Sequence, residues 1–262
     1  LQPVRRPSGM SLQACADIVQ KGDPDRFLAA MAAPVEARRV LFPLYAFNVE
    51  VARAPWVTSE PMIGEMRLQW WRDALEEIGK GGPFRKHEVT VPLSEVLDAD
   101  AAKLLDTGVA ARRWDLYKEA FEDDAHLKNY LEQTGGHLMW VAARALGAPA
   151  DAEEQVRQTG MAAALARFLL AVPELEARGR IPLLDGTPDG VRSLASQVLD
   201  RMTGLNVLRR RLPAQAGAAL LEAWQARDIL EQARRAPERV ASGALGVSEF
   251  RKRLSLMRAS FR

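Results

Sequence analysis

The sequence predicts an all-α protein, built as a single-domain helical bundle of roughly ten to twelve helices. Apolar residues recur with the helical period in nearly every segment, and β-branched runs typical of strands are scarce. With 48% hydrophobic and 27% charged residues, the composition is that of a globular protein. Residues 1–10 are expected to form a flexible tail, and residues 11–262 one domain.

Two helices are expected before the central part of the chain. The first spans residues 11–21, with Ser11 as its capping residue. Asp23 followed by Pro24 predicts the start of the second helix, because an aspartate caps well and proline suits the first helical turn. This second helix is expected to end near Ala33.

The densest apolar and aromatic segment follows, and it is expected to form two helices. Pro34 opens the first of them, and Pro55 ends it because proline disfavours helical geometry in the residue before it. Thr58 or Ser59 is expected to cap the second helix, with Pro61 in its first turn.

That second helix has two distinct faces. The apolar face comprises Met66, Trp70, Ala74 and Ile78. The polar face comprises Glu65, Gln69, Arg72 and Glu76. If the polar face is buried, its members need partners across the bundle, for which Arg53 and Tyr45 are the candidates.

The middle of the chain is divided by glycines and prolines. Residues 79–92 give the longest loop signal, and a helix should then end near Leu105 before a break at Gly108. Two further helices are expected over residues 110–121 and 125–146.

The last part of the chain is also helical in pattern. Asp151 is expected to cap a helix that ends near Val172, and residues 173–188 are expected to be irregular. The remaining helices are expected over residues 190–211, 213–232, 237–245 and 247–262.

Charge and cysteine content exclude several classes of protein. The net charge of +2 excludes a generally electropositive nucleic-acid binder, so no nucleic-acid partner is expected. The single Cys15 excludes an internal disulfide and fits a reducing, cytoplasmic compartment. No apolar run approaches the roughly 20 residues needed to span a bilayer.

Two segments carry a resemblance to a known family. The segment LFPLYAFNVEVAR contains Tyr45-Ala46-Phe47, and SEPMIGEMRLQWWRDALEEI contains a tryptophan-arginine pair, Trp71-Arg72. Together they resemble the squalene and phytoene synthase family. The resemblance implies an isoprenoid-synthase bundle whose enzymes join two prenyl diphosphates head to head, with magnesium ions holding the diphosphate charge.

The aspartates that this chemistry requires are absent. Counting from Tyr45-Ala46-Phe47, the outer aspartates of the family's first motif fall at Ala52 and Trp56. The polar residues of the second motif fall at Ala164, Arg167, Ala171 and Leu175. Magnesium prefers carboxylate oxygens, so neither a magnesium site nor another cofactor is expected.

The variant pattern is most similar to a branch of the family that includes a mitochondrial assembly factor for respiratory complex I. This similarity implies a protein near a membrane: cytoplasmic and peripheral to an inner membrane, or on the matrix side in a eukaryote. Three functions stay open. The first is a non-catalytic protein that binds an isoprenoid, another lipid or a protein segment. The second is a prenyltransferase whose arginines hold diphosphate, and the third is a membrane-surface assembly factor with protein partners.

The candidate pocket residues are Tyr45, Glu50, Arg53, Glu65, Gln69, Arg72, Arg167 and Arg180. Glu50 and Arg53 either form a polar pocket floor or pair on a partly exposed face. Arg167 lies within an apolar run. It should therefore bind a phosphate, a carboxylate or a glutamate such as Glu50, or extend to the surface along its own stem.

Residues 247–262 form a second candidate site. Phe250, Leu254, Met257 and Phe261 share one face of the predicted helix, and arginines and a lysine crowd the rest. This pattern is typical of a helix that rests on an anionic membrane surface, although a terminal helix packed on the bundle also fits it.

Overall fold

The computed structural model describes residues 8–58 and 60–261, and within these ranges it contains helices and no strand. The all-α prediction is therefore confirmed. The expected tail lies largely outside the described residues. The α-helices are α1 (Ser8–Gly22), α2 (Pro24–Ala32), α3 (Arg38–Arg53), α4 (Pro61–Gly79), α5 (Thr90–Ser94), α6 (Ala99–Ala111), α7 (Asp124–Leu131), α8 (His137–Ala145), α9 (Glu153–Ala177), α10 (Pro188–Leu199), α11 (Leu205–Arg211), α12 (Ala216–Ala219), α13 (Ala226–Arg235), α14 (Glu238–Ala241) and α15 (Glu249–Ser260).

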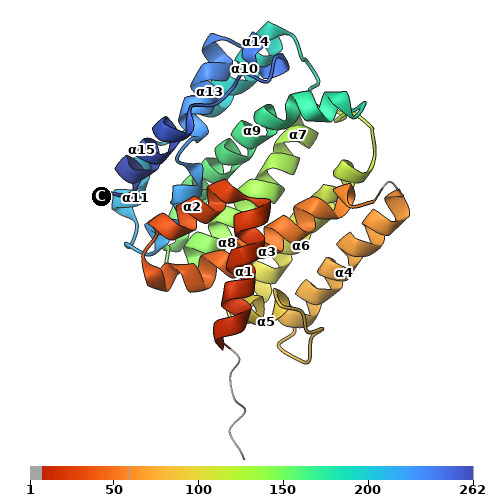
Figure 1. Ribbon diagram of the computed structural model, residues 1–262, viewed down its shortest axis with the longest axis vertical. Coiled ribbons are helices and arrows are strands. Elements are labelled where there is room, and N and C mark those ends of the chain that lie inside the picture. Colours follow the sequence, from red (N-terminus) through yellow and green to blue (C-terminus); the bar gives the residue numbers. More distant parts are fainter. Residues whose placement is uncertain (1–7, 59, 262) are drawn as a thin grey trace, which may run out of the picture.

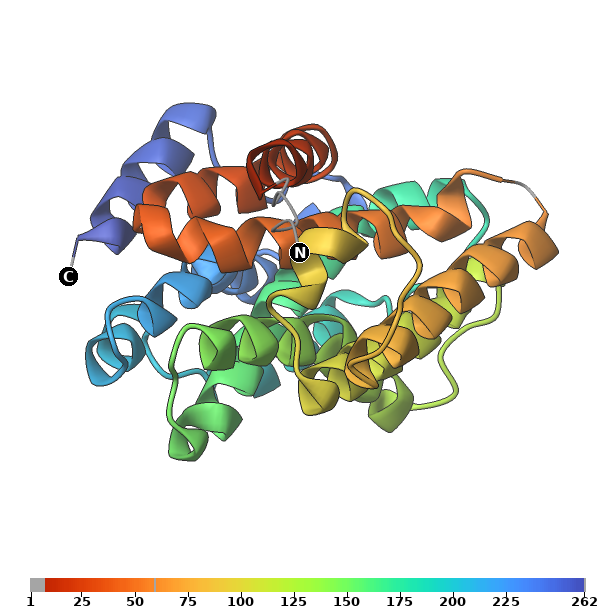
Figure 2. The same cartoon turned by 90° about the horizontal axis from the view of Figure 1, so that it is seen from below.

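Short 3-10 segments and one π segment connect several of these helices. They are η1 (Val35–Ala37), η2 (Ala54–Trp56), η3 (Arg112–Leu116), the π segment η4 (Glu132–Gly136), η5 (Ala150–Ala152) and η6 (Leu220–Ala223). Helix α9 crosses the middle of the bundle, and α4 lies at its outer edge (Figures 1 and 2). No helix among the described residues is long and apolar enough to cross a bilayer.

Helix starts follow the expected capping chemistry at α2 and differ from it at α1 and α4. The Asp23 carboxylate accepts a hydrogen bond from the Arg26 backbone N–H at 3.0 Å. Helix α1 already begins at Ser8, so Ser11 lies inside it. Pro61 opens α4 as expected, but the residue before it is Glu60, which makes no side-chain cap. The alternative cap Ser59 lies outside the described residues.

Two expected breaks are continuous helix. Gly108 lies inside α6, where a β-carbon would come within 2.7 Å of the Gln133 carbonyl oxygen. This glycine therefore permits close packing instead of ending the helix. Pro173 lies inside α9, which runs on to Ala177 because the flanking Val172 and Leu175 stay buried in the core.

Three expected helices are interrupted, among them the one over residues 213–232, which divides into α12, η6 and α13. Over residues 110–121 only the end of α6 and η3 are helical, and Arg180 donates hydrogen bonds to the carbonyls of Trp114 and Tyr117 at 3.2 and 2.6 Å. These tertiary bonds take carbonyls that a longer helix would use. The expected helix over 190–211 divides into α10 and α11, and Arg227 binds the Met202 carbonyl in the gap at 2.9 Å.

Close contact between α9 and η4 fixes the centre of the fold. A β-carbon on Gly160 would lie 2.6 Å from the Gly135 carbonyl oxygen and 2.9 Å from the Gly136 α-carbon. The two backbones therefore touch, and only glycine fits at this point. Buried His137, at the start of α8, accepts a bond from Arg157 of α9 at 2.7 Å.

Candidate functional site

A two-lobed cavity lies between α3, α9 and the 3-10 segments η2 and η3. The inner lobe has a volume of about 210 Å³ and the outer lobe, which reaches α1, about 920 Å³. Every position that corresponds to a polar residue of the family's two motifs lines the inner lobe. These positions are Ala52, Trp56, Ala164, Arg167, Ala171 and Leu175.

A buried ion-pair cluster lies behind the cavity wall. Glu222 of η6, whose side chain is fully buried, accepts hydrogen bonds from Arg26 of α2 and from Arg167 of α9. The Arg167–Glu222 distance is 3.1 Å, and the same guanidinium also binds the Glu222 carbonyl oxygen at 2.9 Å. Asp23 pairs with Arg26 at 2.7 Å. The Glu222 carboxylate thus connects η6 with α2 and α9.

The electrostatics of this cluster favour charged arginines and a neutral tyrosine. Burial alone would raise the pKa of Asp23, but the charges of Arg26 and Arg167 lower it below its usual range. Burial acts to lower the pKa of Arg26, and Glu222 and Asp23 reverse that effect and raise it. Burial and Glu222 raise the pKa of Tyr45, whose ring lies 5.7 Å below the Arg26 guanidinium.

A second polar cluster closes the other side of the inner lobe. Arg112 of η3 binds the Asp115 carboxylate at 3.1 Å and the Tyr130 hydroxyl oxygen at 2.9 Å. Burial raises the pKa of Tyr130, so its hydroxyl keeps its proton and donates it to Asp115 at 2.9 Å. Asp115 is the one carboxylate that lines the inner lobe, and its oxygens already bind Arg112 and Tyr130.

Three of the four predicted pocket residues on α3 and α9 line the cavity. Glu50 pairs with the exposed Arg53 at 2.7 Å, and both line the outer lobe. Arg167 lines both lobes, but its partner is Glu222 and not Glu50. Tyr45 lies in the core beneath Arg26.

Arg180 lies beside the cavity rather than in it. It is buried, donates to the backbone carbonyls of Trp114 in η3 and of Tyr117 just after it, and its guanidinium lies 4.7 Å from the Trp56 ring. Its contacts thereby hold the tryptophan that lines both lobes.

The predicted residues on α4 lie elsewhere, because this helix turns Gly64, Leu68 and Trp71 inward and its polar face outward. Glu65 pairs with Arg113 at 2.8 Å and accepts a bond from Tyr117 at 2.6 Å, instead of meeting Arg53 or Tyr45. The expected apolar face is also incomplete at one end, since Met66 is exposed.

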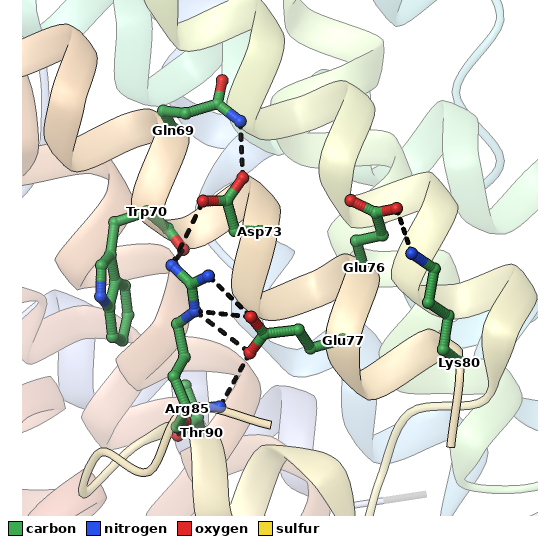
Figure 3. Close-up of polar contacts among 8 residues, drawn as sticks. All are labelled: Gln69, Trp70, Asp73, Glu76, Glu77, Lys80, Arg85 and Thr90. Atoms are coloured by element: carbon green, nitrogen blue, oxygen red, sulfur yellow. Dashed lines mark hydrogen bonds and ion pairs between the residues drawn. The ribbon is translucent and has the colours of Figure 1, made fainter. Parts of the chain in front are cut away.

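Gln69 and Arg72 bind neighbours on the outer side of the bundle. Arg72 pairs with Asp106 of α6 at 2.7 Å. Figure 3 shows Gln69 bound to Asp73, and Asp73 and Glu77 holding Arg85, so that this face secures the loop after α4. These polar residues of α4 therefore stabilise the scaffold and do not contact the central cavity.

Sequence reasoning missed the residues that dominate the site. Glu222 is 196 residues from Arg26 and 55 from Arg167, and no local pattern marks it. Arg26 follows a correctly predicted helix cap, but the cap gives no sign that its side chain turns into the bundle. Asp123 caps α7, where its carboxylate accepts a bond from the His126 backbone N–H at 2.7 Å.

The magnesium chemistry of the motif would need a cage of carboxylate oxygens in the cavity. Among the described residues no group of three or more His, Cys, Asp or Glu side chains has the arrangement of a metal site. The inner lobe offers alanine, tryptophan and leucine at the expected ligand positions, and three arginines instead of an oxygen cage. These residues do not fit a magnesium cluster.

Comparison of the sequence with known proteins shows the family of this chain. The squalene/phytoene synthase family model matches residues 19–247. The complex I assembly factor 6 of Homo sapiens is 26% identical over 244 residues, covering 84% of this chain and 73% of that protein. Its Drosophila melanogaster homolog is 26% identical over 258 residues, covering 87% of this chain and 77% of that protein.

Solved structures share the fold. A dehydrosqualene synthase crystal structure superimposes with a TM-score of 0.77 at 17% identity, covering 96% of each chain. A squalene synthase from Alicyclobacillus acidocaldarius gives a TM-score of 0.70 at 18% identity, covering 88% of this chain and 96% of that one.

Proposed function

The chain belongs to the squalene/phytoene synthase family, and from this premise we propose that it is a non-catalytic member that acts as an assembly factor. One observation carries the proposal: the six motif positions face the inner lobe without a single carboxylate among them. Head-to-head coupling expels diphosphate, and its charge needs divalent cations that this wall cannot hold. The names of the relatives support a role in building respiratory complex I.

Arginine could in principle replace magnesium, since guanidinium matches phosphate geometry. In this cavity, however, Arg26 and Arg167 are bound to Glu222, and Arg112 is bound to Asp115. Most of their charge is therefore already compensated. This compensation is the reason for preferring an assembly role to a prenyltransferase with altered diphosphate-binding residues.

Deletion of the gene in the organism that encodes this chain is expected to lower the amount of assembled complex I. Blue native electrophoresis and NADH:quinone reductase activity measure the loss, and re-expression of the unaltered chain should reverse it. An unchanged amount of complex I in the deletion strain contradicts the assembly role.

The absence of catalysis is tested separately, by measuring the release of pyrophosphate. Purified protein supplied with farnesyl or geranylgeranyl diphosphate and magnesium should release no pyrophosphate, whereas an active family member run in parallel should. Release of pyrophosphate by this chain would overturn the proposal even if complex I falls in the deletion strain.

We further propose that the protein works at an anionic membrane surface, through α15. This helix packs on the bundle through Leu256, yet Phe250, Met257 and Phe261 remain exposed at 75, 50 and 70%. Its exposed basic residues are Arg251, Arg253 and Arg258. Apolar groups interspersed with arginines suit a bilayer of acidic lipids. The proposed location is therefore peripheral, at an inner membrane or on the matrix side.

Substituting the exposed arginines of α15 should release the protein from vesicles. Liposome flotation with phosphatidylglycerol-containing vesicles should recover the parent chain and lose a variant with Arg251, Arg253 and Arg258 changed to glutamine. Each basic residue near an anionic surface contributes about 1 kcal/mol, so the affinity should fall roughly 100-fold.

A matched variant with three exposed arginines changed elsewhere separates α15 from overall charge. Arg67, Arg113 and Arg192 serve for this purpose, since α15 contains none of them. Equal flotation of the two triple variants would exclude α15 as the membrane contact. Surface substitutions are preferable to truncation, because Trp224 donates to the Lys252 carbonyl at 3.3 Å and the core would be opened.

A further inference from the structure

The first two turns of α4 leave an apolar face exposed. Met62, Ile63 and Met66 are 74, 39 and 67% exposed. Helical spacing directs Met62 and Met66 away from Gly64 and Leu68, which pack inward. Helix α4 begins at the edge of the molecule in both views (Figures 1 and 2), so this face is accessible to another protein. A contiguous apolar surface of this kind is typical of an interaction site.

Two residues of opposite charge border this apolar face. Glu60 immediately precedes α4 and Arg67 lies seven residues further on, so both stand along the same side of the helix, two turns apart, beside Ile63. Both side chains are exposed, and neither has an ion-pair partner among the residues that the structure describes. Glu65, on the other side of the helix, is already paired with Arg113. One acidic and one basic group therefore remain available to a partner.

A second copy of the chain, packed antiparallel along this face, would complement it. If a twofold axis passes between residues 63 and 64, Glu60 of each copy faces the partner's Arg67. Met62 then lies within one residue's rise, about 1.5 Å, of the position opposite the partner's Met66. Ile63 lies beside its own equivalent next to the axis. A single arrangement thus pairs the apolar side chains with one another and the charges with opposite charges.

We propose that the protein forms a homodimer through an antiparallel contact between the first two turns of α4 in each copy. The ion pair of Glu60 with the partner's Arg67 would occur twice, because a twofold interface repeats every contact. Methionine suits the centre of this contact, since its flexible side chain adapts to the opposing surface. Helix α15 lies on the opposite side of the bundle from α4 (Figure 1), so the dimer leaves it uncovered.

The charges on this part of α4 favour a second copy over an anionic bilayer. Glu60 and Arg67 carry opposite charges, and Glu65 is neutralised by Arg113. Such a balanced border gives no net attraction to acidic lipids, in contrast to α15, on which basic residues predominate. An identical copy supplies both missing charges. The dimer is independent of the assembly role, and either conclusion can fail without the other.

Sedimentation velocity of the full chain over a range of protein concentrations tests the dimer. Glu60→Lys and Arg67→Glu should each weaken self-association about tenfold, because two favourable charge contacts become two contacts between like charges. Arg210→Glu is the matched control, since it reverses the charge of an exposed arginine on α11. It should associate as tightly as the parent chain. A parent chain that sediments as a monomer at every concentration would overturn the proposal.

An equimolar mixture of Glu60→Lys and Arg67→Glu tests the antiparallel register. In the mixed dimer, the new positive charge at position 60 of one chain faces the new negative charge at position 67 of the other. At the second contact, the native Arg67 and Glu60 face each other. The mixture should therefore associate about tenfold more tightly than either variant alone. A purely structural effect of the substitutions would not produce this rescue, and a mixture that associates no better than its components contradicts the dimer.

The double variant Met62→Gln with Met66→Gln tests the apolar part of the contact. Its circular dichroism spectrum should match that of the parent chain, because both side chains lie outside the core. Self-association should fall roughly 100-fold, since the dimer would no longer bury four methionine side chains. Unchanged self-association of this variant would exclude α4 as the interface. If the variant instead loses vesicle flotation while its sedimentation is unchanged, the face contacts a bilayer, and the proposal is equally overturned.

Discussion

Glu222→Gln is expected to lower the free energy of unfolding by about 3–5 kcal/mol, the effect of removing one partner from a buried ion pair. The Glu222 side chain is fully buried, and Arg26 is only 6% exposed. Without the carboxylate charge, Arg26 and Arg167 remain as two like charges held together in the interior. Urea denaturation followed by circular dichroism measures the difference.

An exposed pair gives the matched control. Glu76 binds Lys80 at 2.5 Å on α4, with both side chains more than 60% exposed. Glu76→Gln removes the same charge in solvent and should change the free energy of unfolding by less than about 0.5 kcal/mol. If both variants lower the free energy of unfolding by similar amounts, the buried ion pair of Glu222 contributes no more to stability than an exposed pair.

Gly160→Ala should destabilise the protein by about 3 kcal/mol or more, because the methyl group would overlap backbone atoms that have no freedom to move aside. The new β-carbon would lie 2.6 Å from the Gly135 carbonyl oxygen and 2.9 Å from the Gly136 α-carbon. In a helix without such contacts, alanine is about 1 kcal/mol better than glycine. A decrease in the free energy of unfolding, instead of the usual increase, would therefore indicate the close contact between α9 and η4.

Gly82→Ala is the control for this substitution. A β-carbon at Gly82 meets no atom within 4 Å. Its replacement should be neutral or stabilising by up to about 1 kcal/mol, because alanine restricts the unfolded chain. Thermal denaturation of both variants measures the contrast, and a Gly160→Ala protein as stable as Gly82→Ala would contradict the close backbone contact.

The sequence was enough to predict the helix starts that depend only on neighbouring residues. Asp23 and Pro24 open α2, and Pro61 opens α4, because capping and proline geometry involve only neighbouring residues. Counting from Tyr45-Ala46-Phe47 singled out Ala52 and Trp56 as motif positions, and both line the cavity, Ala52 from α3 and Trp56 from η2. The same local reasoning was wrong at Gly108, where the glycine serves a contact with a distant segment.

The sequence by itself determined an all-α chain of this family, with alanine and tryptophan where metal ligands would stand, because helical periodicity and motif spacing are local. Only the tertiary structure decided which charges meet. Glu222 reaches Arg26 and Arg167 across many turns of chain, and Glu65 faces Arg113 instead of the cavity. Such pairings depend on how helices pack against one another, and the spacing of residues within one helix does not specify that packing.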